Sequence, residues 1–521
     1  MSTPAPLLLA VDVGTQSVRA VVFDRSGHVG AAACRSIEPP FATPRPGWAE
    51  QDPRVYWCAL GEAVTALWRG AAVAPGAVAA LTLTTQRGTV VCADAQGEPL
   101  RPAIVWPDAR RADVLPALGL AWGAALRLAR AHALVRRLQA QAEANWIAQH
   151  EPQLWARCAR FGLLSTWLTQ RLVGAWVDSA ACQVGYLPFD HRRGQWARAG
   201  DWRWRALALH AAQLPRLAAP ASVLGHLTNE AAAALGLPRG LPVVAAAADK
   251  ACELLGCGVL APDAAHLSLG TAAAIDTMQP RYCEVQRLLP AFPAAWPGHW
   301  NTEVHVPRGM WLVSWFREQF GAPERARAAA LGVEPETLFD ELLAATPPGA
   351  LGLVLQPYWS PGLREPGPEA RGAIVGFGEM HGRAHLYRAL VEGVMFALRA
   401  GREAIEARLG RRLVALHASG GGACSARVLQ VAADMFGLPV QRPAVDETSA
   451  LGAAMLAAAA LGLHEDVPAA ARAMARGGLV VEPDAAAVAA YDALYREVYR
   501  PLYGRLRPLY ARLRALTGYP P

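Results

Sequence analysis

Residues 12–19 carry the groups that a phosphate-binding turn needs. A glycine at a turn lets the backbone approach a phosphate without a Cβ in the way. Consecutive turn amides form a concave anion site, hydroxyl and guanidinium groups add donors, and a carboxylate suits Mg²⁺. The alternative is an ordinary hairpin turn with a structural aspartate. The candidate phosphate-binding residues are Asp12, Gly14, Thr15, Gln16, Ser17 and Arg19.

A second turn of the same kind stands much later in the chain. Residues 268–271 read Ser-Leu-Gly-Thr and end an apolar run, as Gly14 and Thr15 do. Taken alone, this segment is explained by a plain turn. Paired with the first loop, it predicts two facing hairpins that clamp a triphosphate, with Gly270 and Thr271 at the outer phosphates.

A run of three glycines, Gly420, Gly421 and Gly422, lies between a predicted strand and a predicted helix. This position suits close backbone contact with a ribose or an adenine, and the following helix N-terminus favours anions. A flexible loop is the alternative. The sequence contains neither GxxxxGK[ST] nor GxGxxG, which excludes the Walker and Rossmann types of nucleotide site.

Asp249 stands at the end of an apolar run and is followed by Lys250, the single lysine of the chain. A carboxylate at a buried strand end can accept a hydroxyl proton as a general base. The alternative is simple capping of the next helix. A lone lysine suggests a site that needs a compact ammonium, although chance also explains its survival. The candidate metal ligands are Asp12 and Asp249.

Polar residues beside an indole predict a surface that binds a sugar, which we call the acceptor wall. The segments 85–89, Thr-Gln-Arg-Gly-Thr, and 106–110, Trp-Pro-Asp-Ala-Arg, both follow predicted strands. Such groups can bond sugar hydroxyls while the indole stacks on the C–H face. The alternatives are a solvated loop and a core tryptophan. The candidate substrate-binding residues are Gln86, Arg87, Trp106, Asp108 and Lys250.

These groups need elements that bring them together. Apolar runs bounded by turn residues predict strands at residues 7–13, 18–23, 28–33, 78–84, 90–93, 102–105, 241–248 and 413–417. Residues 121–170 have a helical composition. A strand at 264–271 repeats the opening pattern, which predicts a duplicated α/β domain. We expect an N-terminal domain at 1–258, a C-terminal domain at 259–480 and a surface helical tail at 481–521.

Composition limits the class of protein. Of the residues, 53% are hydrophobic and 18% are charged, a composition that supports folded hydrophobic cores. With 521 residues, the chain is longer than a single hydrophobic core usually supports. Its net charge of +7 is spread without like-charge blocks, so we expect no nucleic-acid partner. The nine cysteines include no CxxC pair, and no apolar stretch is long enough to span a bilayer. We therefore expect a cytoplasmic protein without membrane contacts.

The motifs, in this order, resemble the FGGY family of carbohydrate kinases within the actin-like ATPase superfamily. The resemblance rests on DVGTQSVRA, RPGWAEQDP, TQRGT, WPDAR, Asp249, SLGT, GLREP, SGGGACS and TSALGAA. It implies an α/β fold of two actin-like (ribonuclease H-like) domains with the active site in the interdomain cleft. Three positions depart from the xylulose and glycerol kinase patterns: Arg87, Gly88 and Lys250.

The resemblance also implies an activity. It is ATP- and Mg²⁺-dependent transfer of phosphate to a hydroxyl of a small sugar or polyol, with a pentulose such as xylulose favoured and glycerol or another polyol as the alternative. Asp249 falls on the catalytic aspartate of the family. A catalytically silent nucleotide-binding regulator on the same fold is the rival function. A homodimer is left open.

Overall fold

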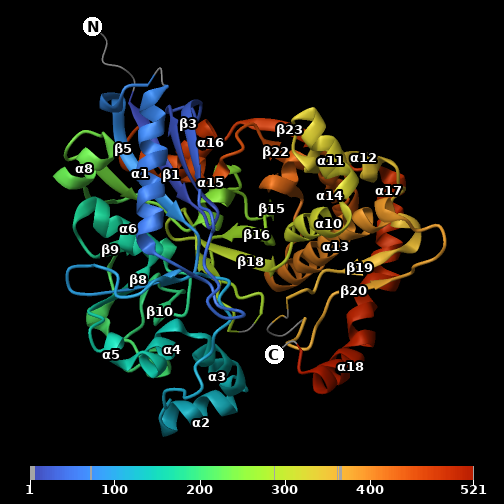
Figure 1. Cartoon of the computed structure of the whole chain (residues 1–521), viewed down its shortest axis with the longest axis horizontal. Coiled ribbons are helices and arrows are strands. Elements are labelled where there is room, and N and C mark those ends of the chain that lie inside the picture. The colour runs from blue at the N-terminus through green and yellow to red at the C-terminus, as the bar shows by residue number, and fades with distance from the viewer. Residues whose placement is uncertain (1–5, 71–72, 287, 361, 363–365, 520–521) are drawn as a thin grey trace.

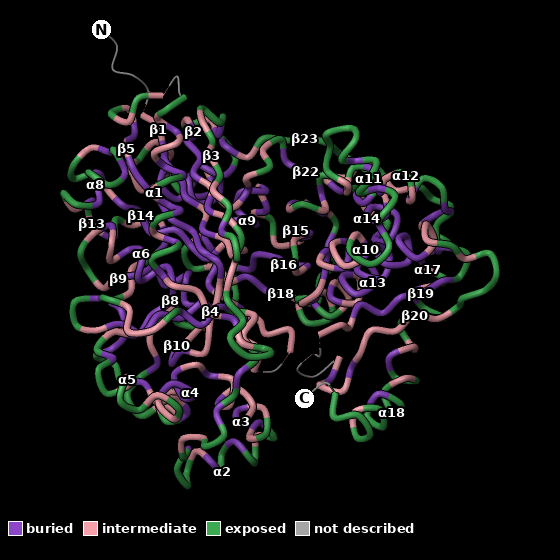
Figure 2. The backbone as a smooth tube through the Cα atoms, in the orientation of Figure 1, coloured by how far each residue is buried: buried purple, intermediate pink, exposed green. Residues whose placement is uncertain are grey.

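The computed structural model describes residues 6–70, 73–286, 288–360, 362 and 366–519. It has two lobes, each built around a large sheet (Figure 1). Figure 2 shows that these sheets are buried, whereas the outer helices expose one side. Within the described residues, no helix is both long enough and apolar enough to cross a bilayer.

The first lobe contains a six-stranded sheet in the order β13-β14-β5-β1-β2-β3. The chain opens with the hairpin-connected strands that the turn residues predicted. Strands β5 and β14 add beside β1 in parallel, and β13 pairs antiparallel at the edge. The β1–β2 turn lies at the ends of β1 and β2. The bounds are β1 (Leu7–Val13), β2 (Ser17–Phe23), β3 (Val29–Ser36), β5 (Val78–Thr85), β13 (Val223–His226) and β14 (Pro242–Ala245).

The second lobe contains a seven-stranded sheet in the order β17-β18-β16-β15-β21-β22-β23. The bounds are β15 (Ala264–Leu269), β16 (Ala273–Gln279), β17 (Phe292–Pro293), β18 (Trp300–Val306), β21 (Ala415–Ser419), β22 (Val440–Pro443) and β23 (Gly477–Val481).

The two large sheets share one topology, which agrees with the predicted duplication. In each, a three-stranded antiparallel meander (β1-β2-β3 or β15-β16-β18) is followed by two parallel strands and one antiparallel edge strand. The β1–β2 and β15–β16 turns therefore occupy equivalent places. These turns carry the two predicted phosphate loops.

Both faces of the first sheet are covered, because β1 is apolar on each side. Leu9, Val11 and Val13 pack with α1 (Pro53–Arg69), α6 (Leu164–Val173) and α8 (Asn229–Leu235). Leu8 and Ala10 pack on the other face, with α9 (Asp249–Gly256) and α15 (Thr448–Ala460). The late helix α15 thus belongs to the core behind the first sheet.

The second sheet is covered differently on its two faces. Ala265, Leu267 and Leu269 pack into a core with α10 (Trp311–Phe320), α13 (Arg383–Leu409) and α14 (Ala426–Phe436). The alternate residues of β15, His266 and Ser268, are polar yet fully buried. They point to the opposite face, where α9 lies.

Two glycines let the lobes join closely. A Cβ on Gly452 of α15 would lie 1.9 Å from the carbonyl oxygen of Cys252 in α9. A Cβ on Gly256 would lie 2.0 Å from the carbonyl oxygen of Thr448. Helices α9 and α15 therefore cross with their backbones in contact, which fixes Asp249 relative to both sheets.

A smaller four-stranded sheet forms the base of the first lobe. Its order is β4-β7-β6-β8, and helices α2 to α5 accompany it. The prediction that residues 121–170 are helical is wrong at one point, because Arg160–Leu163 is a strand that pairs with β6. The bounds are β4 (Glu50–Gln51), β6 (Val90–Ala93), β7 (Ala103–Ile104), β8 (Arg160–Leu163), α2 (Leu120–Leu128), α3 (His132–Gln141), α4 (Glu143–His150) and α5 (Pro152–Trp155).

The C-terminal tail is more deeply packed than the expected surface helix. It forms α17 (Ala485–Leu494), a π-helical turn at 495–499 and α18 (Arg500–Thr517). Tyr491, Tyr495 and Tyr499 recur every four residues, so they share one face and are buried in the core of the second lobe.

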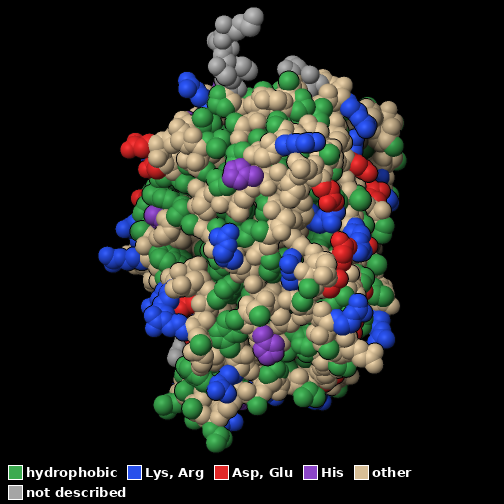
Figure 3. All heavy atoms as spheres, turned by 90° about the vertical axis from the view of Figure 1, so that its left-hand side faces the viewer, with side chains coloured by type: hydrophobic (Ala, Val, Ile, Leu, Met, Phe, Trp, Pro, Cys, Tyr) green, Lys and Arg blue, Asp and Glu red, His purple; other side chains and the backbone are tan. Residues whose placement is uncertain are grey.

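The remaining elements connect these layers. They are α7 (Trp202–Ala206), α11 (Ala322–Leu331), α12 (Pro335–Ala344), α16 (Val467–Met474), β9 (Val177–Ser179), β10 (Phe189–Asp190), β11 (Gln195–Trp196), β12 (Arg216–Ala218), β19 (Val354–Gln356) and β20 (Ala373–Val375). On the outer face shown in Figure 3, basic side chains are scattered among apolar and acidic ones.

Candidate active site

A cleft of about 2170 Å³ lies between the lobes. This volume exceeds the roughly 300–1,000 Å³ of a single small-molecule site, so the cleft has room for more than one small ligand. All but one of the sequence-predicted site residues line it. From the first lobe these are Asp12, Gly14, Thr15, Gln16, Ser17, Arg19, Gln86, Arg87, Trp106, Asp249 and Lys250, and from the second lobe Gly270, Thr271, Gly420, Gly421 and Gly422.

The first predicted phosphate loop is the turn between β1 and β2. The Gly14 N–H donates to the Ser17 carbonyl over 3.0 Å, which closes the turn. The Thr15 hydroxyl donates to Gln86 Oε1 at 2.5 Å and accepts from the Trp106 indole N–H at 2.9 Å. The phosphate loop and the predicted acceptor wall are therefore hydrogen-bonded to each other.

Asp12 carries an unusual charge environment. Burial, and then the negative charge of Asp249, raise the pKa of Asp12 to about 7, although Arg19 opposes this shift. Two carboxylates so placed favour a cation between them. Among the described residues, no three His, Cys, Asp or Glu side chains gather as a metal cage. Mg²⁺ commonly uses only one or two carboxylates plus phosphates and water, so Asp12 and Asp249 fit it.

Asp249 is the first residue of α9, at the end of the segment that follows β14. Ala248, and not Asp249, occupies the N-cap position, and Asp249 Oδ1 accepts from the Lys250 backbone N–H over 2.8 Å. Its side chain is 29% exposed toward the cleft, with Arg87 Nε 3.9 Å away. Burial raises the pKa of Asp249, while Lys250 and Arg87 lower it and limit the rise. The carboxylate is fixed in place and accessible.

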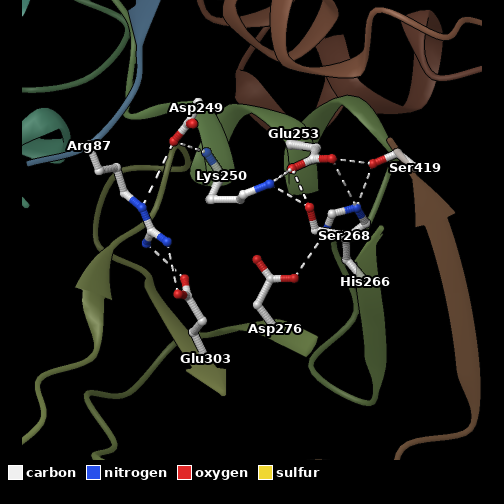
Figure 4. Close-up of polar contacts among 9 residues, drawn as sticks. All are labelled: Arg87, Asp249, Lys250, Glu253, His266, Ser268, Asp276, Glu303 and Ser419. Atoms are coloured by element: carbon white, nitrogen blue, oxygen red, sulfur yellow. Dashed lines mark hydrogen bonds and ion pairs between the residues drawn. The ribbon is translucent and has the colours of Figure 1, made fainter. Parts of the chain in front are cut away.

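Arg87 spans the cleft to a residue that the sequence did not single out. Its two terminal nitrogens donate to the carboxylate oxygens of Glu303, on β18, over 2.8 and 2.9 Å (Figure 4). The guanidinium also lies over the ring of Phe292, 5.4 Å from its centre. Burial alone would raise the pKa of Glu303, but Arg87 outweighs burial and holds it at about 2. The pair is therefore ionised.

Lys250 points away from this wall. Its ammonium donates to Glu253 Oε2 over 2.8 Å and to Ser268 Oγ over 2.5 Å. Burial alone would lower the pKa of Lys250, but Glu253 and Asp249 raise it above its ordinary value, so the amine is charged. Figure 4 shows the ammonium directed toward the strand that carries the second phosphate loop.

A buried polar network lies behind that loop. Glu253 Oε1 accepts from the Ser419 hydroxyl over 2.6 Å, and Ser419 Oγ lies 2.7 Å from His266 Nε2. The opposite ring nitrogen, Nδ1, lies 2.9 Å from Asp276 Oδ1. Burial alone would lower the pKa of His266, but neighbours including Cys257 and Asp276 raise it well above its ordinary value. His266 therefore lies between the carboxyl groups of Asp276, at 2.9 Å, and Glu253, at 3.9 Å.

The glycine run has a defined shape. Gly420 has a φ of 87°, and a Cβ there would lie 2.9 Å from the carbonyl carbon of Leu269. This turn thus packs against the second phosphate loop, which only a glycine permits. Ser425 then caps α14 by accepting from the Val428 N–H. The alternative of a merely flexible loop is not supported.

One predicted site residue lies elsewhere. Asp108 accepts from the Ala49 N–H over 2.6 Å and forms an ion pair with Arg110 at 2.7 Å, and its side chain is 4% exposed. Arg110 stacks on Trp48, 4.0 Å from the ring centre. Asp108 therefore holds the base of the first lobe together, and we remove it from the substrate-binding residues. Its acidic character in a polar loop gave no sign of this burial.

Two residues that line the cleft, Glu303 and Glu253, were not predicted from the sequence. Glu303 interrupts an otherwise ordinary strand, and its partner Arg87 lies far away in sequence, so no local pattern pairs them. Glu253 lies three residues after Lys250, a spacing that puts both on one helix face. An acidic residue in the apolar segment 251–257 was the signal that could have found it.

Known proteins are similar to this chain over most of its length. Residues 7–256 match the N-terminal domain, and residues 265–461 the C-terminal domain, of the FGGY family of carbohydrate kinases. A glycerol kinase of Dechloromonas aromatica is 31% identical over 88% of this chain and 90% of its own length. The uncharacterized sugar kinase YgcE of Escherichia coli is 28% identical over 95% and 93%.

A solved structure agrees with these sequence relatives. The crystal structure of xylulose kinase from Rhodospirillum rubrum superposes with a TM-score of 0.79 at 28% identity, covering 97% of this chain and all of that one. The two-lobed α/β architecture, with matched sheets around a cleft, is thus the architecture of these kinases. The chain belongs to the FGGY family of carbohydrate kinases.

Proposed function

We propose that this protein transfers the γ-phosphate of ATP to a hydroxyl of a small neutral sugar or polyol. One observation carries the proposal. Asp249 lines the same cleft as the two glycine turns and as Arg87 and Trp106, and its carboxylate lies 3.9 Å from Arg87 Nε. A carboxylate at this point can reach an acceptor hydroxyl while the phosphate stays on the loops.

The residues divide the reaction between them. The turn amides around Gly14 and Gly270 hold the phosphates, and Arg19 adds a cation near the first turn. Asp249 orients the acceptor hydroxyl and takes its proton as the oxygen bonds to the γ-phosphorus. The bond from that phosphorus to the β-phosphate oxygen breaks, and its electron pair leaves with ADP. Such transfers depend mainly on positioning and electrostatics.

A magnesium ion supplies charge neutralisation to the phosphates when it is bound. Asp12 would hold it, with Asp249 beside it, because burial and then the negative charge of Asp249 raise the pKa of Asp12, and a bound cation would offset the repulsion between the two carboxylates. Arg19 neutralises less of the phosphate charge than its position suggests, because its guanidinium already lies 3.4 Å from the carboxylate of Glu447.

The charges on the acceptor wall favour a neutral substrate. Arg87 is matched by Glu303, with Asp249 close by, and the Lys250 ammonium points away from this wall toward Ser268. A sugar acid would have to break the buried Arg87–Glu303 pair to find a cation in the wall, which costs free energy. Among neutral acceptors a pentulose such as xylulose is favoured, with glycerol or another polyol as the alternative, because kinases of both kinds are similar to this chain.

The rival function is a nucleotide-binding regulator that transfers no phosphate. A regulator has no need of a carboxylate placed between phosphate loops and a polar wall, as Asp249 is. It would bind ATP with Mg²⁺ and show no acceptor-dependent turnover.

The test is an ADP-release screen over ketoses, aldoses, polyols and sugar acids, with Mg²⁺ and ATP. We expect turnover with a neutral ketose or polyol, and a loss of about 10²–10⁴-fold in Asp249→Asn, the range for removing a general base. Asp113→Asn, at a carboxylate 78% exposed, is the control. Acceptor-dependent turnover that survives Asp249→Asn, or ATP binding without turnover on the full panel, contradicts the proposal.

A further inference from the structure

We propose that the ammonium group of Lys250 binds the oxygens of the phosphoryl group in transfer, and that Glu253 is the residue that positions it. The inference deepens the proposed function and rests on it for the identity of the nucleotide. It gives the single lysine of the chain a role that differs from binding the sugar.

The Lys250 side chain crosses from the first lobe to the second. Its backbone N–H holds Asp249, yet its ammonium reaches Ser268 on β15, the strand that leads into the second phosphate loop. The Nζ atom lies 4.0 Å from the point that a Cβ on Gly270 would occupy. One residue thus links the proposed general base to the loop that would hold the outer phosphates (Figure 4).

The ammonium has donor capacity left for a ligand. A lysine ammonium has three N–H groups, and two of them go to Glu253 and Ser268. Among the described residues, no third acceptor is found for Nζ, and the residue lines the cleft with 19% of its side chain exposed. Lys250 and Gly270 line the cleft side by side, so a ligand held by the second loop would lie within reach of the ammonium.

Glu253 keeps the ammonium from moving. Its Oε2 accepts from Lys250 and Ser268, and its Oε1 accepts from Ser419. Ser419 directly precedes the glycine run, and its hydroxyl is held in turn by His266. The carboxylate comes from α9 but is fixed by two strands of the other lobe. A charge fixed before the reaction needs little reorganisation when charge develops on the phosphate.

The direction of the Lys250 side chain does not suit a sugar-binding role. In the acceptor wall, the Trp106 indole donates to Thr15 and Arg87 is paired with Glu303. The Lys250 ammonium faces Ser268 and Gly270 instead. In the transfer it remains protonated. The acceptor proton goes to Asp249, and the lysine only neutralises oxygens of the phosphoryl group.

Nucleotide binding tests the inference without any acceptor. Calorimetry compares Lys250→Met with the unchanged protein, using Mg²⁺ with ADP or with a non-hydrolysable ATP analogue that keeps the γ-phosphoryl position. We expect the analogue to lose about tenfold or more in affinity, as for a lost hydrogen bond to a charged group, and ADP to change less than about twofold. Arg327→Met removes a surface cation paired with Glu341 and is the control.

Equal losses for both nucleotides, or none, would overturn the inference. The proposed function fails separately, through the absence of an acceptor in the ADP-release screen. A Lys250→Met variant that does not fold is recognised by the absence of a cooperative thermal unfolding transition, and Lys250→Arg then takes its place. The longer, planar guanidinium cannot reproduce both anchoring bonds, so we expect it to lose the same discrimination in part.

A spectroscopic readout uses the fact that the chain contains one lysine. Labelling with lysine carrying ¹³C at Cε gives one side-chain signal in the whole protein. We expect the signal to move when the ATP analogue binds and to move much less with ADP. In Glu253→Gln the signal should broaden in the absence of nucleotide, and Glu253→Asp should restore part of the selective binding. An unchanged signal in Glu253→Gln contradicts the positioning role.

Discussion

Arg87 of the first lobe and Glu303 of the second lobe form a bidentate ion pair across the cleft, with N–O distances of 2.8 and 2.9 Å. The side chains are only 18% and 8% exposed. Arg87 Nε also lies 3.9 Å from Asp249. The pair with Glu303 therefore holds the Arg87 side chain in place and keeps its positive charge beside the proposed base. A hydroxylated acceptor would meet a wall whose charges already cancel.

Removing one partner of this pair should cost more stability than removing both. Arg87→Met leaves Glu303 ionised and unpaired in a mostly buried site, which typically costs about 3–5 kcal/mol in the free energy of unfolding. Adding Glu303→Gln removes the stranded charge, so we expect part of that loss to be recovered. Urea unfolding of both single variants and the double variant measures the coupling. Additive losses would contradict a direct pair.

The same pair makes the protein sensitive to acid. The pKa of Glu303 is held at about 2, below its ordinary value of 4.5. A carboxyl group whose pKa is depressed in the folded state adds stability above pH 4.5, and that stability is lost as the pH falls toward 2. We expect the melting temperature to fall less steeply between pH 5 and pH 3 in Glu303→Gln. An identical slope in the two proteins would count against the ionised pair.

Magnesium–nucleotide binding should release protons near neutral pH. With a pKa of about 7, part of the Asp12 population is protonated at pH 6.5, and a bound cation favours the ionised form. Affinity for Mg²⁺–ATP should therefore weaken as the pH falls below 7. Calorimetry at pH 6.5 in buffers of different ionisation enthalpy counts the protons. The release should vanish in Asp12→Asn, and its persistence there would assign it to another group.

The helix crossing between the lobes should not tolerate a methyl group. In Gly452→Ala the new Cβ would stand 1.9 Å from a backbone oxygen of Cys252. The backbone of α9 cannot move aside as a flexible side chain can, so the clash remains. We expect a loss of at least about 2 kcal/mol in the free energy of unfolding.

Gly61, inside α1, is the matched control for this substitution. A Cβ there meets nothing within 4 Å, so Gly61→Ala should stabilise the protein by about 0.4–1 kcal/mol. Chemical unfolding of the two variants decides the matter. Similar effects in both would mean that the two helices are not in backbone contact.

Much of the fold could be predicted from local sequence. The strands expected at residues 7–13 and 90–93 have those bounds in the structure, because continuous apolar runs between turn residues have few other ways to be buried. The expected strand at 264–271 forms over Ala264–Leu269. The strand Arg160–Leu163 was missed, because four residues between helices carry no periodicity and only pairing with β6 defines them.

The candidate site divides in the same way. Both glycine turns and Asp249 were found from the sequence, since strand ends and turns are local features, and the structure brings them to one cleft. Whether a polar side chain faces the cleft or the core is not local. Asp108 was expected at the acceptor and instead bonds Ala49 and Arg110.

The sequence by itself determined the family, the repeated strand–turn–strand pattern and the residues at the phosphate turns and the proposed base. Only the tertiary structure decided which charges meet. The pair Arg87–Glu303 and the contacts of Lys250 with Ser268 and of Glu253 with Ser419 depend on how the two sheets approach each other. Coulomb energies and buried hydrogen bonds act over a few ångströms in space, whatever the separation along the chain. The contacts across the cleft, and with them the role proposed for the single lysine, therefore had to be read from the folded molecule.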